Sequence, residues 1–153
     1  IMDQEYEGIM APADIHNAIS FLLERAFPRS LVFFVSDFAD QAFERDFTPL
    51  LRPVVEKVDF VPVVIRDPLE KDVSLGKSVS IAVRDNEGDG NAEIHMTPGK
   101  LKEIQRVSAV HLLHLERNFH QVGIEHVVLD SPSIDDCHRV LSGFFENRKR
   151  TRG

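Results

Sequence analysis

The sequence predicts an α/β fold, with a parallel Rossmann-like sheet, helices on both of its faces and an additional β-hairpin. Three apolar runs, Leu31–Val35, Phe60–Ile65 and Ile124–Leu129, have the length and the β-branched character of strands. Segments with helical spacing separate them, and strands that alternate with helices pack as a parallel sheet between helical layers. Because the runs do not alternate with polar residues, we expect strands covered on both faces.

Four segments place apolar residues at helical spacing. They are Pro12–Phe27, a stretch that ends at Val58, Pro98–Val122, and a segment from Ser133 to the basic cluster at residues 148–152. Pro49 and Pro53 leave the start of the second helix undecided, because proline is tolerated only in a first turn. Thr97 is a good N-cap for the third helix, and Gly123 is a good residue to end it.

The hairpin is predicted from Lys77–Val83 and Ala92–Met96, which are joined by a stretch rich in turn-forming residues. Asp85, Glu87 and Asp89 within this turn resemble the first half of an EF-hand loop. The twelfth position, however, is Met96 instead of a bidentate glutamate, and a strand stands where the exiting helix should be. We therefore expect a hairpin turn and no calcium site.

All three predicted parallel strands end in polar residues. These residues are Ser36, Asp37, Arg66, Asp67 and Asp130, with Asp40 shortly after the first strand. Parallel strands bring their carboxyl ends to one edge of the sheet, and open α/β sheets bind ligands beyond that edge. We therefore predict a binding rim formed by these six residues; the alternative is that strand exits are polar only because water reaches them.

Charge and composition exclude several classes of protein. The net charge of −7 disfavours nucleic-acid binding. No apolar run approaches the roughly 20 residues of a membrane span, so no membrane contact is expected. Cys137 is the only cysteine, which rules out a disulfide framework within one chain and favours a cytoplasmic location. The basic cluster at residues 148–152 is interpreted as a solvated helix end, or alternatively as a tail that docks on an acidic partner.

Catalytic and metal-binding motifs are weak in this sequence. His111 and His114 have the spacing of a helical metal pair, but no third ligand is evident, so partial burial of His111 is the favoured interpretation. No glycine-rich phosphate loop or nucleophile elbow is present. Asp37 and Asp40 are paired carboxylates with the chemistry for acid–base work, yet no supporting residue is identifiable. We therefore favour a binding protein over an enzyme.

Longer stretches carry a resemblance to a known family. The segments RSLVFFVSDFAD, VDFVPVVIRDPLEKD, GIEHVVLDS and FFENRKR, in this order, resemble the C-terminal half of a von Willebrand factor type A-like domain. More closely, they resemble the bacterial domain-of-unknown-function family number fifty-eight, over about Ala13 to Arg150. Type A domains bind a divalent cation at the strand ends through an Asp-x-Ser-x-Ser motif, a threonine and an aspartate. Asp37 matches the aspartate, but Ala13 stands at the threonine position and the motif is absent. The resemblance therefore implies the location of a metal site, but this chain lacks the residues to build it, so we expect no metal or other cofactor here and a divalent cation only in an intact domain.

The same resemblance implies a function and an incomplete domain. It suggests a protein-binding or scaffold module, working with a MoxR-type AAA+ ATPase in complex assembly; the alternative is a metal-dependent hydrolase or other enzyme that uses the acidic rim. Residues 1–153 are expected to form a single, truncated type A-like α/β domain. The Leu31–Val35 strand would then be an exposed edge, covered by missing polypeptide, by the N-terminal segment or by a second copy in a homodimer.

Overall fold

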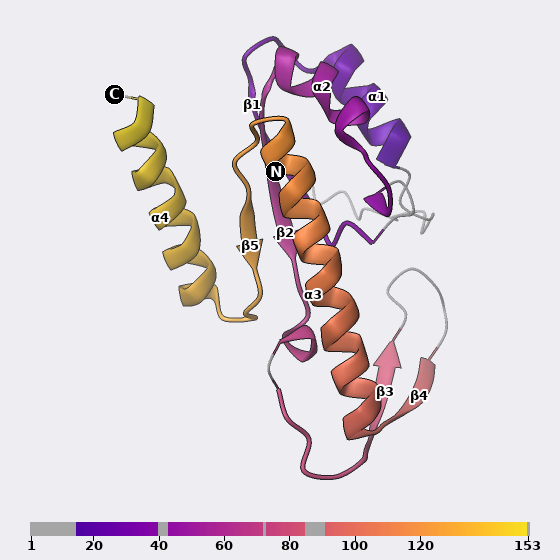
Figure 1. The fold of residues 1–153 in the computed structure, drawn as a ribbon. Coiled ribbons are helices and arrows are strands. Elements are labelled where there is room, and N and C mark those ends of the chain that lie inside the picture. Colours follow the sequence, from indigo (N-terminus) through magenta and orange to yellow (C-terminus); the bar gives the residue numbers. More distant parts are fainter. Residues whose placement is uncertain (1–14, 40–42, 72, 85–90, 153) are drawn as a thin grey trace, which may run out of the picture.

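The structure is a computed structural model that describes residues 15–39, 43–71, 73–84 and 91–152, and its helices and strands alternate as predicted (Figure 1). In chain order the elements are α1 (Ile15–Arg25), β1 (Leu31–Ser36), α2 (Thr48–Lys57), β2 (Asp59–Ile65), the 3₁₀ helix η2 (Pro68–Glu70), β3 (Val79–Arg84), β4 (Asn91–Met96), α3 (Pro98–Gln121), β5 (Val127–Leu129) and α4 (Ile134–Arg152). Among the helices of these described ranges, none combines the length and the apolar character that a membrane span requires. The predicted α/β class is confirmed.

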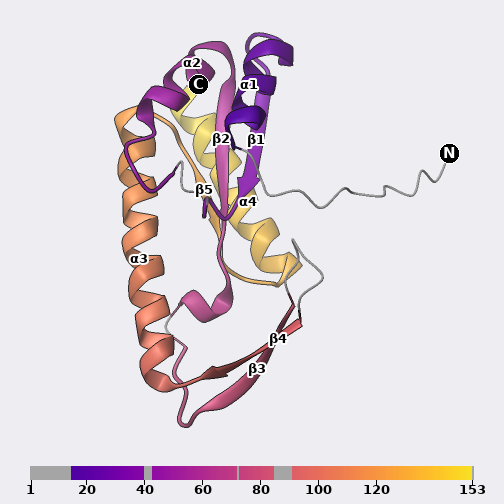
Figure 2. The same ribbon diagram turned by 90° about the vertical axis from the view of Figure 1, so that its right-hand side faces the viewer.

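The three predicted strands form one parallel sheet in the order β1–β2–β5 (Figure 2). Their carboxyl ends therefore share one edge, as the sequence suggested. The third strand is shorter than the predicted Ile124–Leu129, since β5 begins only at Val127 and the chain from Val122 to Ile124 is used to end α3. Gly123 has a φ of 72°, which glycine adopts without strain, and the amide of Ile124 donates to the carbonyl of Phe119 at 2.9 Å.

Helices cover the two faces of the sheet unequally. On one face α1, α2 and α3 bury Phe34, Phe60 and Val64 in the main core. On the other face α4 lies over β2 and β5, where Leu141 and Phe144 pack against the buried Val61, Val63 and Val127. Figure 1 shows the sheet nearly edge-on between these two layers. The sheet thus separates a large core from a small one.

The expectation that β1 is covered on both faces is wrong. Leu31, Phe33 and Val35 are 46%, 42% and 58% exposed, and they point to the face that α4 only partly covers. Phe33 still touches α4, with its ring 5.8 Å from that of Phe145. β1 is also the outer strand of the sheet, with β2 as its only strand partner among the described residues. The homodimer through the Leu31–Val35 edge stays a prediction.

The remaining elements follow the sequence with some corrections. α2 runs through Pro53, and the side chain of Thr97 caps α3 by accepting from the amide of Lys100 at 3.2 Å. The hairpin β3–β4 pairs antiparallel from Val79 opposite Met96 onward, and it forms a sheet of its own. Ile134 belongs to the helically spaced apolar residues that we expected to face the core from α4, but it is 84% exposed. The proposed EF-hand-like residues 85–90 lie outside the described residues.

His126 provides a pH-dependent term in stability. Burial lowers the pKa of this imidazole, and Glu116, whose Oε1 lies 3.8 Å from its Nε2, only partly opposes that shift. Its pKa in the folded state is therefore below the ordinary value of about 6.5 that it regains on unfolding. We expect the free energy of unfolding to keep its full value above about pH 6.5 and to fall as the pH drops from there through the folded-state pKa. The reason is that the imidazole binds a proton more readily in the unfolded chain than in the folded one. Urea midpoints measured from pH 8 to pH 5 should fall less in His126→Gln than in the parent; parallel curves would contradict this.

Candidate functional site

A pocket of about 440 Å³ lies at the carboxyl-terminal edge of the sheet. Its walls come from the segment that follows β1, from the end of β2, from η2 and from the middle of α3. The apolar lining residues are Val64, Ile65, Ile104, Val107, Leu112 and Leu115, together with Ala39. The polar lining residues are Asp37, Glu44, Arg66, Glu70, Glu103, Ser108 and His111. A mostly apolar pocket with a few polar groups, at the carboxyl ends of parallel strands, is the usual form of a ligand site in this fold class.

The structure brings together two of the six predicted rim residues, Asp37 and Arg66, in this pocket. Ser36 instead accepts a hydrogen bond from the amide of Phe38 at 3.0 Å. Asp67 caps η2 by accepting from the amide of Leu69 at 2.8 Å, and Asp130 forms an ion pair with Lys71 at 2.6 Å. Asp40 lies outside the described residues. Ser36, Asp67 and Asp130 therefore have partners within the chain and are not among the residues that line this pocket.

A sharp turn after β1 exposes Asp37. Phe38 has a φ of 58°, in the left-handed region that non-glycine residues rarely adopt, and its ring is 1% exposed. That ring packs against Phe34, Phe43 and Phe119, at centroid distances of 5.7, 4.9 and 5.5 Å. Burial of the ring holds the unusual backbone in place. The carboxylate of Asp37, which accepts from the amide of Ala39 at 3.0 Å, therefore stands at the pocket wall facing solvent.

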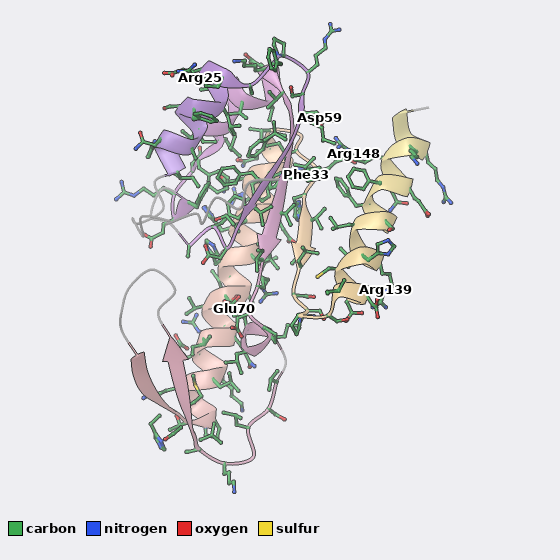
Figure 3. All side chains as sticks on the ribbon, turned by 180° about the vertical axis from the view of Figure 1, so that it is seen from behind. Arg25, Phe33, Asp59, Glu70, Arg139 and Arg148 are labelled. Carbon is green, nitrogen blue, oxygen red and sulfur yellow. The ribbon has the colours of Figure 1, made fainter. Side chains whose placement is uncertain are left out.

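Arg66 is held inside the pocket by η2 and α3. Its side chain is 12% exposed, and its Nη2 donates to the carbonyl of Glu70 at 3.0 Å and to Ser108 Oγ at 3.1 Å. Ser108 Oγ in turn donates to Glu70 Oε2 at 2.6 Å. Glu70, labelled in Figure 3, lies against α3 in this arrangement. Glu70 and Ser108 were not predicted as site residues from the sequence, where the spacing of four residues between Arg66 and Glu70 is the one available signal.

The pocket carries an excess of negative charge. Its lining has four carboxylates, on Asp37, Glu44, Glu70 and Glu103, and a single guanidinium on Arg66. Arg66 is paired with Glu70, and Glu103 is paired with Arg106 outside the pocket at 2.7 Å, a hydrogen bond that lowers the pKa of Glu103. No ion pair to Asp37 or Glu44 is found among the described residues. These two carboxylates are therefore the uncompensated charges of the site.

His111 is the remaining polar group of the pocket. Its Nε2 is buried and has no hydrogen-bond partner within the part of the chain that the structure describes. His114 is committed elsewhere, since its Nε2 lies 2.8 Å from the carbonyl of Arg45 and 3.3 Å from the side-chain amide of Asn118. The two histidines therefore do not form a pair. Over the described ranges, no three His, Cys, Asp or Glu side chains are grouped as metal ligands.

Comparison with known proteins gives one match. Residues 6–111 match the family described as protein of unknown function DUF58. The chain belongs to the DUF58 family. The matched residues include β1, β2, η2 and α3 as far as His111, and so they contain every polar residue of the pocket. No curated protein and no solved structure matches the chain. The resemblance to the domain-of-unknown-function family number fifty-eight, found in the sequence, is thus confirmed.

Proposed function

We propose that this DUF58 chain is a protein-binding or scaffold module, and that its partner docks at the pocket between the segment after β1, the end of β2, η2 and α3. One observation carries the proposal: the carboxyl edge of the sheet holds an open, largely apolar pocket whose carboxylates Asp37 and Glu44 have no cation among the described residues. Apolar surface with unpaired charges around it is a suitable docking surface for a complementary partner. The resemblance to type A domains suggests the class of partner, a MoxR-type AAA+ ATPase that acts in complex assembly.

The arrangement around Asp37 supports the type A-like part of the proposal. Asp37 follows the outer strand of a parallel sheet, at the position where the resemblance places a metal-binding aspartate. A single carboxylate does not hold Mg²⁺ tightly without further oxygen ligands, so a cation at Asp37 would need ligands from beyond the described residues. We propose that the chain forms one type A-like domain and that Asp37 serves it as a docking carboxylate.

The hydrogen bonds of the Ser108 hydroxyl in the pocket favour a binding function over a catalytic one. Ser108 donates to Glu70 and accepts from Arg66, and Arg66 also bonds the backbone of Glu70. The three side chains thus satisfy one another and fasten η2 to α3. A serine nucleophile requires a base that is free to take its proton and an open path to the substrate. The hydrolase alternative therefore has less support than the binding module.

Replacing Asp37 by alanine should weaken partner binding without unfolding the chain. The side chain is exposed, so we expect about a two- to fivefold loss of affinity, the range of one exposed ion pair. Binding to a purified MoxR-type AAA+ ATPase from the same organism can be measured by biolayer interferometry, with thermal unfolding as the test of folding. Glu146→Ala, at an exposed position of α4 away from the pocket, is the matched control. Equal affinities of Asp37→Ala and the parent would refute the proposed docking site.

A further inference from the structure

We infer that the pocket receives one arginine side chain from the partner, with its aliphatic stem on the apolar floor and its guanidinium between Asp37, Glu44 and His111. This inference rests on the proposed function and specifies the chemistry of its docking site. It follows from three independent features of the pocket, which are its exposed apolar floor, its charge and an unsatisfied nitrogen.

The apolar floor is open to solvent. Ile65, Ile104 and Val107 line the pocket and are 47%, 40% and 53% exposed. The volume of about 440 Å³ is at the lower end of the range of about 300–1,000 Å³ for small-ligand pockets, which suits a single long side chain. Arginine and lysine cover apolar surface with their methylene stems while the charged head stays at the polar rim. A long basic side chain therefore matches both parts of this lining.

The charge of the pocket selects a cation. Arg66 and Glu70 neutralise each other, and Arg106 compensates Glu103, which leaves Asp37 and Glu44 without a cationic partner among the described residues. These carboxylates would repel an anionic ligand such as a phosphate, and Nη2 of Arg66, the one guanidinium in the lining, already donates to Glu70 and Ser108. A cationic side chain gains Coulomb attraction from both acids.

The buried nitrogen of His111 favours a hydrogen-bond donor, and arginine in particular. An unpaired buried polar atom is unfavourable, and a turn of the His111 ring that brings Nε2 to the pocket surface would let a donor satisfy it, whereas an apolar occupant would leave it unsatisfied. With its proton on Nδ1, the neutral imidazole accepts at Nε2. The guanidinium carries five N–H donors in a planar fork, so it can bond a carboxylate and a second acceptor at once, and it is more weakly hydrated than an ammonium group.

The test is an NMR titration of the 153-residue chain with Nα-acetyl-arginine N-methylamide. The matched probes are the citrulline, norleucine and lysine analogues, which keep a stem of similar length and change the head group. We expect the arginine probe to shift the methyl signals of Ile104 and Val107 and the ring signals of His111. We expect it to bind at least about fivefold more tightly than citrulline or norleucine, and more weakly at 500 mM than at 20 mM salt.

Variants of the pocket residues test where the guanidinium of the probe binds. Asp37→Asn and Glu44→Gln should each weaken the arginine probe about two- to fivefold, while Glu146→Gln should leave it unchanged. His111→Phe keeps an aromatic ring and removes the nitrogen, so it should weaken arginine and leave norleucine unchanged or tighter. The inference is overturned if citrulline, norleucine or lysine binds as tightly as arginine, if Glu146→Gln weakens binding as much as Asp37→Asn, or if the shifts lie outside the pocket.

The probe and the ATPase assay separate the two proposals. If Asp37→Ala loses the ATPase but the arginine probe does not bind, the docking site stands and the arginine inference fails. If the probe binds at the pocket and the ATPase is unaffected by Asp37→Ala, the pocket recognises arginine and the proposed docking function fails.

Discussion

Replacing Phe119 by alanine should lower the free energy of unfolding by about 3–5 kcal/mol, the range for large-to-small substitutions of a buried phenylalanine. The side chain is 0% exposed, and its ring lies 5.5 Å from Phe38, 5.7 Å from Phe47 and 5.3 Å from His126. Truncation would remove three ring contacts and leave a cavity between α3, the turn after β1 and the segment before β5. A loss of this size is a large part of the roughly 5–15 kcal/mol that stabilises a typical domain.

Urea unfolding, followed by circular dichroism, measures this loss. Phe119→Leu fills most of the space and should cost less than about 1.5 kcal/mol. Phe27→Ala is the control, because it is the same substitution at a position that is 81% exposed. It should change the free energy of unfolding by less than about 0.5 kcal/mol. If Phe119→Ala proved no more destabilising than Phe27→Ala, the packing of Phe119 against Phe38 and Phe47 would not be the main support of the turn at Phe38.

The parallel sheet could be predicted because its information is local. Each strand is a short apolar run with a polar exit, and the helices between the strands force parallel pairing. The same logic placed Asp37 and Arg66 at one edge, and both line the pocket. Asp67 and Asp130 also follow apolar strands, as Asp37 does, but Asp67 caps η2 and Asp130 pairs with Lys71. Position at a strand exit therefore does not show whether a carboxylate is free for a ligand.

The contribution of α3 to the site could not be predicted from its spacing. Ile104 lies on the helical stripe expected to enter the core, yet it is 40% exposed and forms part of the pocket wall. The long helix extends past the edge of the three-stranded sheet (Figure 1). The residues on its inward stripe therefore meet η2 and the pocket in its first half and middle, and the core toward its carboxyl end. His111 and Ser108 become site residues only through this tertiary placement.

The covering of β1 was a different kind of error. An apolar run shows that a strand needs partners on both faces, but it does not show that those partners belong to the same chain. Val32 and Phe34 pack against the main core, whereas Leu31, Phe33 and Val35 remain largely exposed beside α4. The apolar composition of β1 is thus that of a strand covered on both faces. Among the described residues, however, β1 is an edge strand with one face largely open.

Arg148 shows how a charge cluster can mislead, and its replacement by alanine is the second large effect we expect. The sequence suggested a solvated helix end, but Arg148 is 8% exposed. Its Nη2 lies 2.6 Å from Asp59 and its Nε lies 2.7 Å from Glu125, and its guanidinium carbon lies 5.2 Å from the centre of the Phe144 ring. Figure 3 shows Arg148 reaching from α4 toward Asp59 at the start of β2. This one side chain ties the end of α4 to the amino-terminal edge of the sheet.

Arg148→Ala should lower the free energy of unfolding by about 2 kcal/mol. Breaking a fully buried ion pair costs about 3–5 kcal/mol, but the side chains of Asp59 and Glu125 are 30% and 48% exposed, so water can reach both after the arginine is removed. Arg148→Lys keeps the charge without the planar fork and should fall between the parent and alanine. Lys149→Ala, at the exposed neighbouring position, should change stability by less than about 0.5 kcal/mol. If Arg148→Ala and Lys149→Ala gave the same urea midpoint, the two ion pairs of Arg148 would add nothing to stability, and α4 would be held to the sheet by the apolar contacts of Leu141, Phe144 and Phe145.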